Sequence, residues 1–498
     1  MRSAKSVADS ATRIGIVASL AFALVRGAGG VTPPTEDALQ DWIAKSSVKI
    51  RSINATDEDF SDLEPLRKAI GSSRVVALGE PSHGAGTGFE AKARLVEYLH
   101  ARLGFDVLVW ESGLYDVRLT AASLRAGQDP QKAAQRGIFS IWSASAEVKP
   151  LLDYVKASQA TTRPIEMAGF DLQFTSDECF QHFADDLRSF VQALAETSLR
   201  DQASRSADRA IAAYEAIRGR IETRRRKNAE ADTIKLSEQA RATMMSEWEK
   251  QDAADFRQDR QRLLENADRT LAILQENRAQ FLQVHSVRQV EFMEHVIANM
   301  RTEGLDLYDV MGPDRPAGTP AFAPRLEVEN RRDAWNANNL RWLIQDVYAG
   351  RKVIVWAHNA HVMNAYYGSD WRTVYGAPHP DAMKPLGVYM KEWLQDRLYT
   401  VITTTYEGQD GWVGVPAPTI VPPAAAGSIE ARMHKMGDKY AFIDLRSLKR
   451  FPQHPAHSLQ QIRLPKYDTN TIRDLSQVAD GILYIDRMAP ATALPPQT

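Results

Sequence analysis

The chain has 498 residues, of which 44% are hydrophobic and 25% charged, a composition typical of a soluble globular protein with two domains or one large domain with an insertion. Its 61 basic and 63 acidic residues nearly cancel, so the charge balance gives no support to a nucleic-acid partner. The single cysteine, Cys179, excludes an internal disulfide framework and any zinc site built on cysteines.

The amino terminus has the layout of a secretory signal peptide, which we place at residues 1–30. Basic residues precede an apolar run at 14–25, and small residues and two prolines follow it. The run is too short to span a bilayer, and no later segment is apolar enough to do so. We therefore expect a periplasmic or secreted protein that has no membrane contact once the signal is removed.

The first part of the predicted catalytic domain, residues 35–180, begins with a helical lead-in at 35–70. A strand-helix-strand unit follows. The short apolar runs at 75–78 and 107–110 are typical of buried strands, and the stretch 89–103 between them has its apolar residues at helical spacing. We interpret this unit as a βαβ crossover with two parallel strands.

Residues 181–310 differ from the rest of the chain, because they are charged, rich in alanine and almost free of glycine and proline. This composition predicts long helices, which we interpret as an insertion that forms a second lobe. A loop with four prolines and two glycines, at 312–324, then returns the chain to the second part of the catalytic domain at 325–498.

The remaining periodic segments complete the predicted fold. Further helices are expected at 117–134 and from 146 onward, and further strands at 164–170, 352–357, 398–406, 440–445 and 481–485. We therefore predict an α/β fold with a mostly parallel sheet flanked by helices, in which the long helical insertion forms the second lobe.

Acids and histidines follow four of the predicted strands. They are Glu80, Glu111, Asp171 and His358, with His83 and His361 three residues beyond two of them. Because the carboxyl ends of parallel strands meet at one edge of a sheet, we expect these side chains to gather in one site. A histidine held by carboxylates can take a proton from water near neutral pH, so the cluster favours general-base chemistry.

In the reaction scheme that we rank first, His83 is the general base that activates water, and a neighbouring carboxylate orients its ring. Glu80, Glu111 and His358 complete the catalytic group. Glycines follow the histidine and would let backbone N–H groups ahead of the next helix approach an oxyanion. These glycines are Gly84, Gly86 and Gly88.

Four further side chains are candidates for substrate binding. They are Lys92, Arg94, Asp171 and His361. Lys92 and Arg94 lie in the first turns of the helix after His83, where they either face solvent or neutralise a carboxylate or a polar group of the substrate.

Other functions use the same residues. In a second scheme, the Glu and His side chains hold a divalent metal, but their spacings lack the zincin helix pattern, so we assign no metal and no cofactor. In a third scheme, Ser82 is a nucleophile, although it does not lie in a Gly-x-Ser-x-Gly elbow. A non-catalytic protein that holds a ligand or haem through Glu80, His83 and His358 is a further alternative.

The sequence resembles the erythromycin esterase family in several stretches that occur in the family's order over nearly the whole mature chain. These stretches are Gly79 to Gly84, Phe89 to Leu95, Gly104 to Glu111, Gly169 to Leu172, Arg332-Asp333 with Asn339-Leu340, Ala357 to His361, and Ala479 to Asp486. Each motif is modest alone, but together they are specific.

This resemblance implies an α/β core with helical additions and a metal-independent hydrolase that opens a macrolide lactone with water, as the antibiotic-resistance members do. Under it, His83 is the general base, and the other polar residues of the site are Glu80, Glu111, His358 and His361. The expected partner is a small ester or lactone, with no nucleic acid.

Overall fold

The computed structural model describes residues 36–233, 238–314, 326–365, 383–415, 417–446, 448, 460–463, 467, 469–472 and 474–494. The predicted signal peptide at 1–30 lies outside these residues. Within them, no helix is long and apolar enough to cross a membrane.

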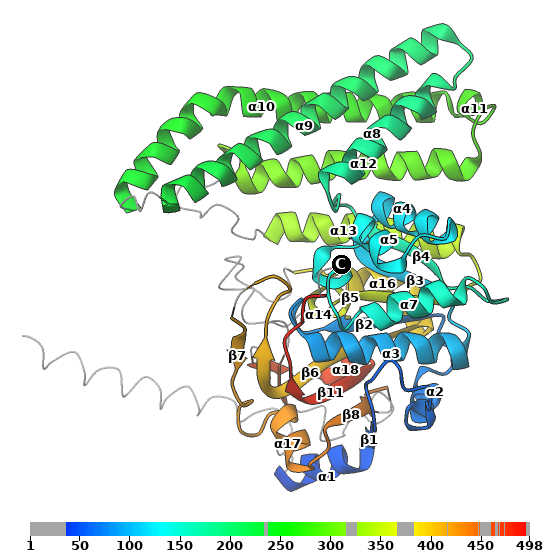
Figure 1. Cartoon of the computed structure of the whole chain (residues 1–498), viewed down its shortest axis with the longest axis vertical. Coiled ribbons are helices and arrows are strands. Elements are labelled where there is room, and N and C mark those ends of the chain that lie inside the picture. Colours follow the sequence, from blue (N-terminus) through cyan, green and yellow to red (C-terminus); the bar gives the residue numbers. More distant parts are fainter. Residues whose placement is uncertain are drawn as a thin grey trace, which may run out of the picture.

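A mixed, mostly parallel sheet forms the centre of the lower part of the molecule (Figure 1). Its order is β1 (Ser47–Lys49), β8 (Tyr440–Asp444), β11 (Gly481–Met488), β6 (Leu398–Asp410), β2 (Val75–Glu80), β5 (Val353–His358), β3 (Val107–Gly113) and β4 (Glu166–Asp171), with β7 (Thr419–Val421) paired to β6. The run from β11 to β4 is parallel, whereas β8, β1 and β7 pair antiparallel with their neighbours. The predicted fold class is confirmed.

The predicted strand-helix-strand unit is present as β2, α3 (Gly86–Leu103) and β3, but its two strands are not neighbours. β5 lies between them and pairs in parallel with both. In this register Glu80 is opposite His358. A strand from the second part of the chain therefore brings a histidine between the two acids of the first part.

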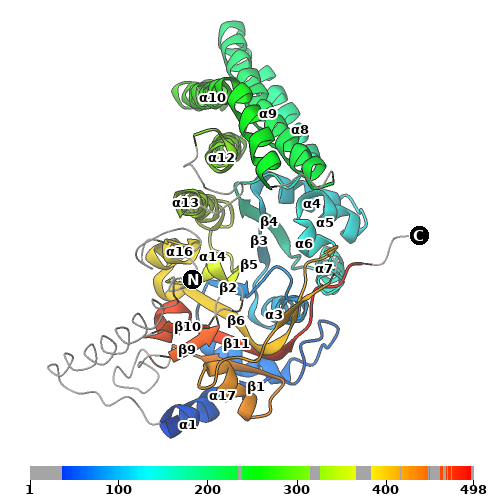
Figure 2. The ribbon, with the colours of Figure 1, turned by 90° about the vertical axis from the view of Figure 1, so that its left-hand side faces the viewer.

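Alternate residues of the strands face two different cores, as the period of two in a strand requires. Val75 and Ala77 of β2 face a core that continues into α13 (Leu326–Trp342), α16 (Leu386–Leu394) and the helical lobe. Val76 and Leu78 face a second core built from α2 (Glu64–Ile70), α3 and α7 (Lys149–Ser158). Figure 2 shows α3 and α7 on one side of the strands and α13 and α16 on the other.

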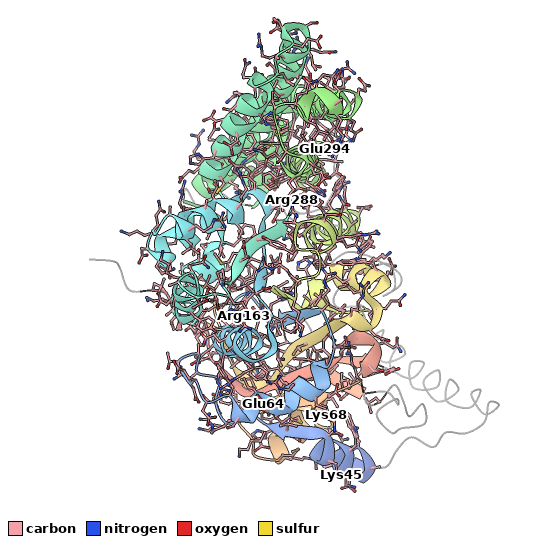
Figure 3. All side chains as sticks on the ribbon, turned by 90° about the vertical axis from the view of Figure 1, so that its right-hand side faces the viewer. Lys45, Glu64, Lys68, Arg163, Arg288 and Glu294 are labelled. Carbon is pink, nitrogen blue, oxygen red and sulfur yellow. The ribbon has the colours of Figure 1, made fainter. Side chains whose placement is uncertain are left out.

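Helices form a lobe where the insertion was predicted. They are α8 (Asp177–Gln192), α9 (Thr197–Thr233), α10 (Glu238–Glu276), α11 (Arg278–Phe281) and α12 (Val287–Met311). The serines before α8 and α12 cap these helices, since their side chains accept hydrogen bonds from Cys179 and Gln289 backbone N–H groups. Arg288 of α12, labelled in Figure 3, donates to the Val347 carbonyl at 2.8 Å and so ties the lobe to the sheet domain.

The helix predicted at 117–134 is two helices, α4 (Leu114–Arg125) and α5 (Pro130–Gly137). Asp129 accepts a hydrogen bond from the Lys132 N–H at 2.9 Å, and Pro130 occupies the first turn. A capping acid followed by proline starts a new helix rather than continuing the previous one.

The other elements are α1 (Glu36–Ser46), α6 (Ser140–Ser143), α14 (Asn359–Val362), α17 (Ile429–Lys435), α18 (Leu475–Val478), β9 (Gln460–Arg463), β10 (Thr469–Ile472), the short turns η1 (Ser61–Leu63) and η4 (Gln395–Arg397), and the π-helical turn η2 (Leu343–Val347). Strands β9 and β10 form a separate antiparallel pair.

Candidate active site

The carboxyl ends of β2, β5 and β3 bring three of the predicted site residues together. Glu80 is the last residue of β2, and His358 is the last residue of β5. Glu111 lies near the carboxyl end of β3, followed only by Ser112 and Gly113. The His358 backbone N–H donates to Glu111 Oε2 at 2.8 Å. All three side chains are buried, so water screens the electrostatic interactions in this group only weakly.

Glu80 is held by three donors and is fully buried. The His83 Nδ1 atom lies 3.4 Å from Glu80 Oε1, and Trp142 Nε1–H donates to the same oxygen at 3.2 Å. The Lys92 ammonium donates to the other oxygen, Oε2. The carboxylate therefore orients the imidazole of His83 and is itself fixed from two other directions.

The structure places Lys92 in this group, where its ammonium contacts Glu80. Its ammonium also donates to the Ala357 carbonyl at 3.1 Å and lies 4.1 Å from the centroid of a Trp356 ring. Burial lowers the pKa of Lys92, although the charge of Glu80 opposes this effect. Lys92 is a buried counter-ion for Glu80.

His83 lies at the open side of the group, with 21% of its side chain exposed. Its Nδ1 atom faces Glu80, and its Nε2 atom has no hydrogen-bond partner among the described residues. Rings surround it: the centroids of His358, Trp142 and Trp412 lie 4.9, 5.4 and 5.6 Å from the His83 centroid. One imidazole nitrogen is thus held and the other can accept a proton.

A second ionic cluster adjoins the first. His361 lies between two carboxylates, with Nε2 at 3.2 Å from Glu111 Oε1 and Nδ1 at 2.7 Å from Asp333 Oδ1. Arg332 pairs with Asp171 and lies 3.6 Å from Glu111. The structure therefore brings Asp171 and His361 to the group, but each is bound to a protein partner.

The pKa shifts in the second cluster keep its pairs ionised. Burial alone would raise the pKa of Glu111, but the charges of His361 and His83 hold it well below its usual value. Burial alone would lower the pKa of His361, whereas Asp333 and Glu111 hold it well above its usual value. Both shifts favour the ionised forms, a Glu111 carboxylate in contact with a His361 imidazolium.

Both ring nitrogens of His358 are engaged. The Ala360 N–H donates to Nδ1 at 3.1 Å, which caps α14, and Nε2 lies 3.0 Å from the Pro81 carbonyl. Because Nδ1 is an acceptor, the proton must be on Nε2, which donates to Pro81. Burial and the charge of His83 lower the pKa of His358 well below its usual value, so its ring is neutral and supports the turn before His83.

The structure does not bring Arg94 to the site. Its guanidinium is buried on another face of α3, where it donates to both carboxylate oxygens of Asp62 at 2.8 and 2.9 Å. It also donates to the carbonyls of Ser52 and Asp59. Arg94 and Lys92 are two residues apart, and on a helix such residues point about 200° apart around the axis.

We expect Arg94→Ala to destabilise the fold by about 3 kcal/mol while leaving turnover unchanged, because it leaves the buried carboxylate of Asp62 without its counter-ion. Urea unfolding would measure the stability and steady-state kinetics the turnover. A variant of native stability that has lost turnover would return Arg94 to the list of substrate-binding residues.

The first scheme expected the glycines after His83 to leave backbone N–H groups free for an oxyanion. In the structure, the N–H groups of residues 84 to 87 are instead bound to other parts of the protein. The N–H groups of the turn from Gly84 to Thr87 donate to Ser82 Oγ, the Ser82 carbonyl, the Gly84 carbonyl and the Ala489 carbonyl, respectively. A Cβ atom on Gly84 would collide with the backbone of Gly411, and one on Gly86 with that of Pro490. These glycines instead allow two later segments to pack closely against the turn.

Ser82 is engaged in structural hydrogen bonds. Its hydroxyl donates to Asp410 Oδ2 at 2.9 Å and accepts from the Gly84 N–H at 3.1 Å. Asp410 also accepts from the Tyr467 hydroxyl at 3.1 Å. No described histidine makes a hydrogen bond to the Ser82 hydroxyl, so nothing shown activates it as a nucleophile.

We expect Ser82→Ala to retain activity within about tenfold of the native protein, because the hydroxyl only anchors a turn. Removal of a true serine nucleophile costs about a millionfold in kcat. Steady-state kinetics would separate the two outcomes, and a covalent acyl-enzyme detected by mass spectrometry at Ser82 would establish the third scheme.

The carboxylates of the site already have protein cations as partners. Lys92 pairs with Glu80, and Arg332 and His361 with Glu111. Among the described residues, no group of three or more His, Cys, Asp or Glu side chains is arranged to hold a metal ion.

Several residues of the site had no assigned role in the sequence analysis. Arg332 and Asp333 were visible only as part of a family motif on α13. Trp142 lies in the short helix α6, Asp410 is the last residue of β6, and Trp412 lies in the loop that follows, so no periodic pattern marks them.

Comparisons with known proteins place these residues in a family. A model of the erythromycin esterase family matches residues 100–488, which include Glu111, Arg332, Asp333, His358 and His361. The predicted hydrolase YbfO of Bacillus subtilis is 25% identical over 421 residues, covering 81% of this chain and 80% of its own. Erythromycin esterase type II of Escherichia coli is 35% identical over 74 residues, which cover 15% of this chain and 17% of the relative.

Solved structures share the fold. A Bacillus cereus protein matches with a TM-score of 0.69 and 18% identity, covering 93% of this chain and 100% of its own. A mutant of the erythromycin esterase EreC in its open conformation matches with a TM-score of 0.55 and 13% identity, covering 90% of this chain and 98% of its own. The family model extends over most of the sequence, and the chain therefore belongs to the erythromycin esterase family.

Proposed function

We propose that this chain hydrolyses carboxylic esters or lactones, with His83 as the general base that activates water. The observation that carries the proposal is the state of the His83 ring. Its Nδ1 atom is held by a buried carboxylate, its Nε2 atom has no partner among the described residues, and the side chain is 21% exposed. An imidazole in this arrangement is suited to take a proton from a water molecule.

In the proposed reaction, His83 Nε2 accepts one proton from water as the oxygen attacks the substrate carbonyl. The imidazolium that forms is stabilised by Glu80, to which its Nδ1–H donates. Lys92 and Trp142 keep this carboxylate in place. When the tetrahedral intermediate collapses, His83 returns its proton to the leaving alkoxide, so that an acid and an alcohol are released.

Glu111 contributes a second negative charge near the base. The charges of His361 and His83 hold the pKa of Glu111 well below its usual value, so Glu111 is a carboxylate beside the base. His358 supports the turn that carries His83, through its hydrogen bond to Pro81. We therefore propose that Glu111 acts electrostatically and that His358 is a positioning residue.

Membership of the family and similarity to a predicted hydrolase support the reaction class. One relative is named as an erythromycin esterase, which makes a macrolide lactone the first substrate to test. We also propose export to the periplasm or the cell exterior, on the basis of residues 1–30. The amino-terminal sequence of the protein recovered from culture fractions would test this location.

The function is tested by incubating the protein with a panel of macrolides and simple esters, followed by mass spectrometry. We expect at least one compound to gain one water, and the activity to survive exhaustive chelation. Activity that is lost on chelation and restored by a metal would favour the metal-dependent scheme. A ligand that binds through His83 and Glu80 without any compound gaining water would instead show a binding protein.

A further inference from the structure

We propose that Trp412 forms an apolar wall beside His83 and selects substrates that carry a bulky apolar group next to the scissile carbonyl. The proposal rests on the proposed hydrolase function and adds the substrate class to it. It depends on three observations: the pairing of the site's charges, the exposure of Trp412, and the way the backbone holds this residue.

The carboxylates of Glu80, Glu111 and Asp171 are paired with protein cations and are not available for a polar substrate. Glu80 pairs with Lys92, Asp171 with Arg332, and His361 with both Glu111 and Asp333. These side chains are mostly buried, and a substrate charge that drew one of them away would leave its partner unpaired at a high free-energy cost. Recognition near the carbonyl therefore has to come from other contacts.

Two tryptophans lie beside the His83 ring. The rings of Trp142 and Trp412 both meet the imidazole edge-on, at interplanar angles of 86° and 78°. Trp142 is buried, and its indole N–H is used by Glu80. Trp412 is 47% exposed, so a ring that lies 5.6 Å from the His83 ring, centroid to centroid, still has uncovered apolar surface. Large exposed aromatic surfaces at a site commonly mark where a ligand binds.

The backbone fixes Trp412 against the turn that carries His83. Trp412 lies between β6 and β7, one residue after Gly411. The Gly411 N–H donates to the Gly84 carbonyl at 3.2 Å, and its own carbonyl accepts from Ala491 N–H at 3.1 Å. Trp412 and His83 are therefore positioned by one hydrogen-bonded unit. Because this unit is already ordered, a substrate that contacts Trp412 does not have to order a loop when it binds.

The chemical class that follows is an ester or lactone whose acyl or alcohol part presents several carbons to the indole. Burying one methylene group of a substrate strengthens its binding constant by about fourfold. We therefore expect kcat/KM to rise with each added methylene until the exposed face of Trp412 is covered.

The test uses p-nitrophenyl esters from acetate to octanoate with the native protein, Trp412→Ala and Trp412→Phe. For Trp412→Ala we expect a loss of about tenfold or more on octanoate and less than about threefold on acetate, mostly in KM, because only the long chain reaches the wall. Trp412→Phe should keep most of the chain-length preference. An equal loss on all esters, or no chain-length preference in an active native protein, would overturn the proposal.

Ile420→Ala is the matched control. Ile420 lies on the same hairpin, is 73% exposed, and lines a separate groove of about 870 Å³ with Glu90 and Arg487. This variant should keep the native chain-length preference and the native melting temperature.

Titration calorimetry with 2-decanone and 2-butanone separates failure of this proposal from failure of the proposed function. If no ester is hydrolysed but the native protein prefers 2-decanone and Trp412→Ala does not, the apolar site stands and the hydrolase assignment fails. Equal binding of both ketones by a protein that hydrolyses no ester would overturn both.

Discussion

Replacing His83 with alanine is expected to lower kcat/KM for ester or lactone hydrolysis by about a hundredfold to ten-thousandfold, the range that a positioned general base contributes. The loss should appear in kcat, because in the proposed mechanism His83 acts on water during the reaction and contributes little to substrate binding. The fold should remain intact, since the His83 side chain is 21% exposed and fills no core position. Steady-state kinetics and thermal unfolding would measure the two effects.

His182→Ala is the matched control for this prediction, because His182 is an exposed histidine of α8 in the lobe. It should keep native turnover and native stability. A His83→Ala protein that retains native turnover would exclude His83 as the base and leave the cluster without an imidazole that can exchange a proton, because His358 and His361 have both ring nitrogens engaged.

The sequence was enough to place the acids and histidines at the ends of strands, because strand periodicity and the residue after each run are local features. It did not show that β5 inserts between β2 and β3. Strand order depends on contacts between segments that are more than two hundred residues apart, and no local pattern encodes them. Glu80 and His358 are neighbours because this strand order places β2 beside β5.

The direction of side chains was harder to predict than their position in the sequence. Lys92 and Arg94 were assigned one role together, yet α3 directs Lys92 to Glu80 and Arg94 to Asp62. The glycines after His83 were also misread. Their role depends on the segments at Gly411 and Pro490, which approach the turn only in the folded chain.

Glu111→Ala is expected to destabilise the protein by about 3–5 kcal/mol, the usual cost of removing one partner of a buried ion pair. Glu111 is 2% exposed, and its removal takes one carboxylate from His361 and one from Arg332, which then keep only Asp333 and Asp171, respectively. Urea unfolding would measure the loss. Glu111→Gln, which keeps the shape, provides a second variant should the alanine protein fail to fold.

The pH dependence of this loss follows from the two shifted pKa values. The pKa of Glu111 lies below its ordinary 4.5 in the folded state. Its contribution to the free energy of unfolding is therefore present above pH 4.5 and is lost as the pH falls through the pKa of the folded state. The pKa of His361 lies above its ordinary 6.5 in the folded state. Its contribution to the free energy of unfolding is therefore fully present below pH 6.5 and is lost as the pH rises through the pKa of the folded state.

The stability difference between the native protein and Glu111→Ala should therefore be largest between pH 4.5 and 6.5, where both contributions are complete. A double-mutant cycle with His361→Ala should give a coupling free energy of about 1–3 kcal/mol in this range, since the two groups are in contact. A difference that does not change with pH, together with additive effects of the two mutations, would show that Glu111 stabilises the fold by packing and not by its charge. The buried chain from Asp333 to Glu111 would then not be the ionised support for the base that its geometry indicates.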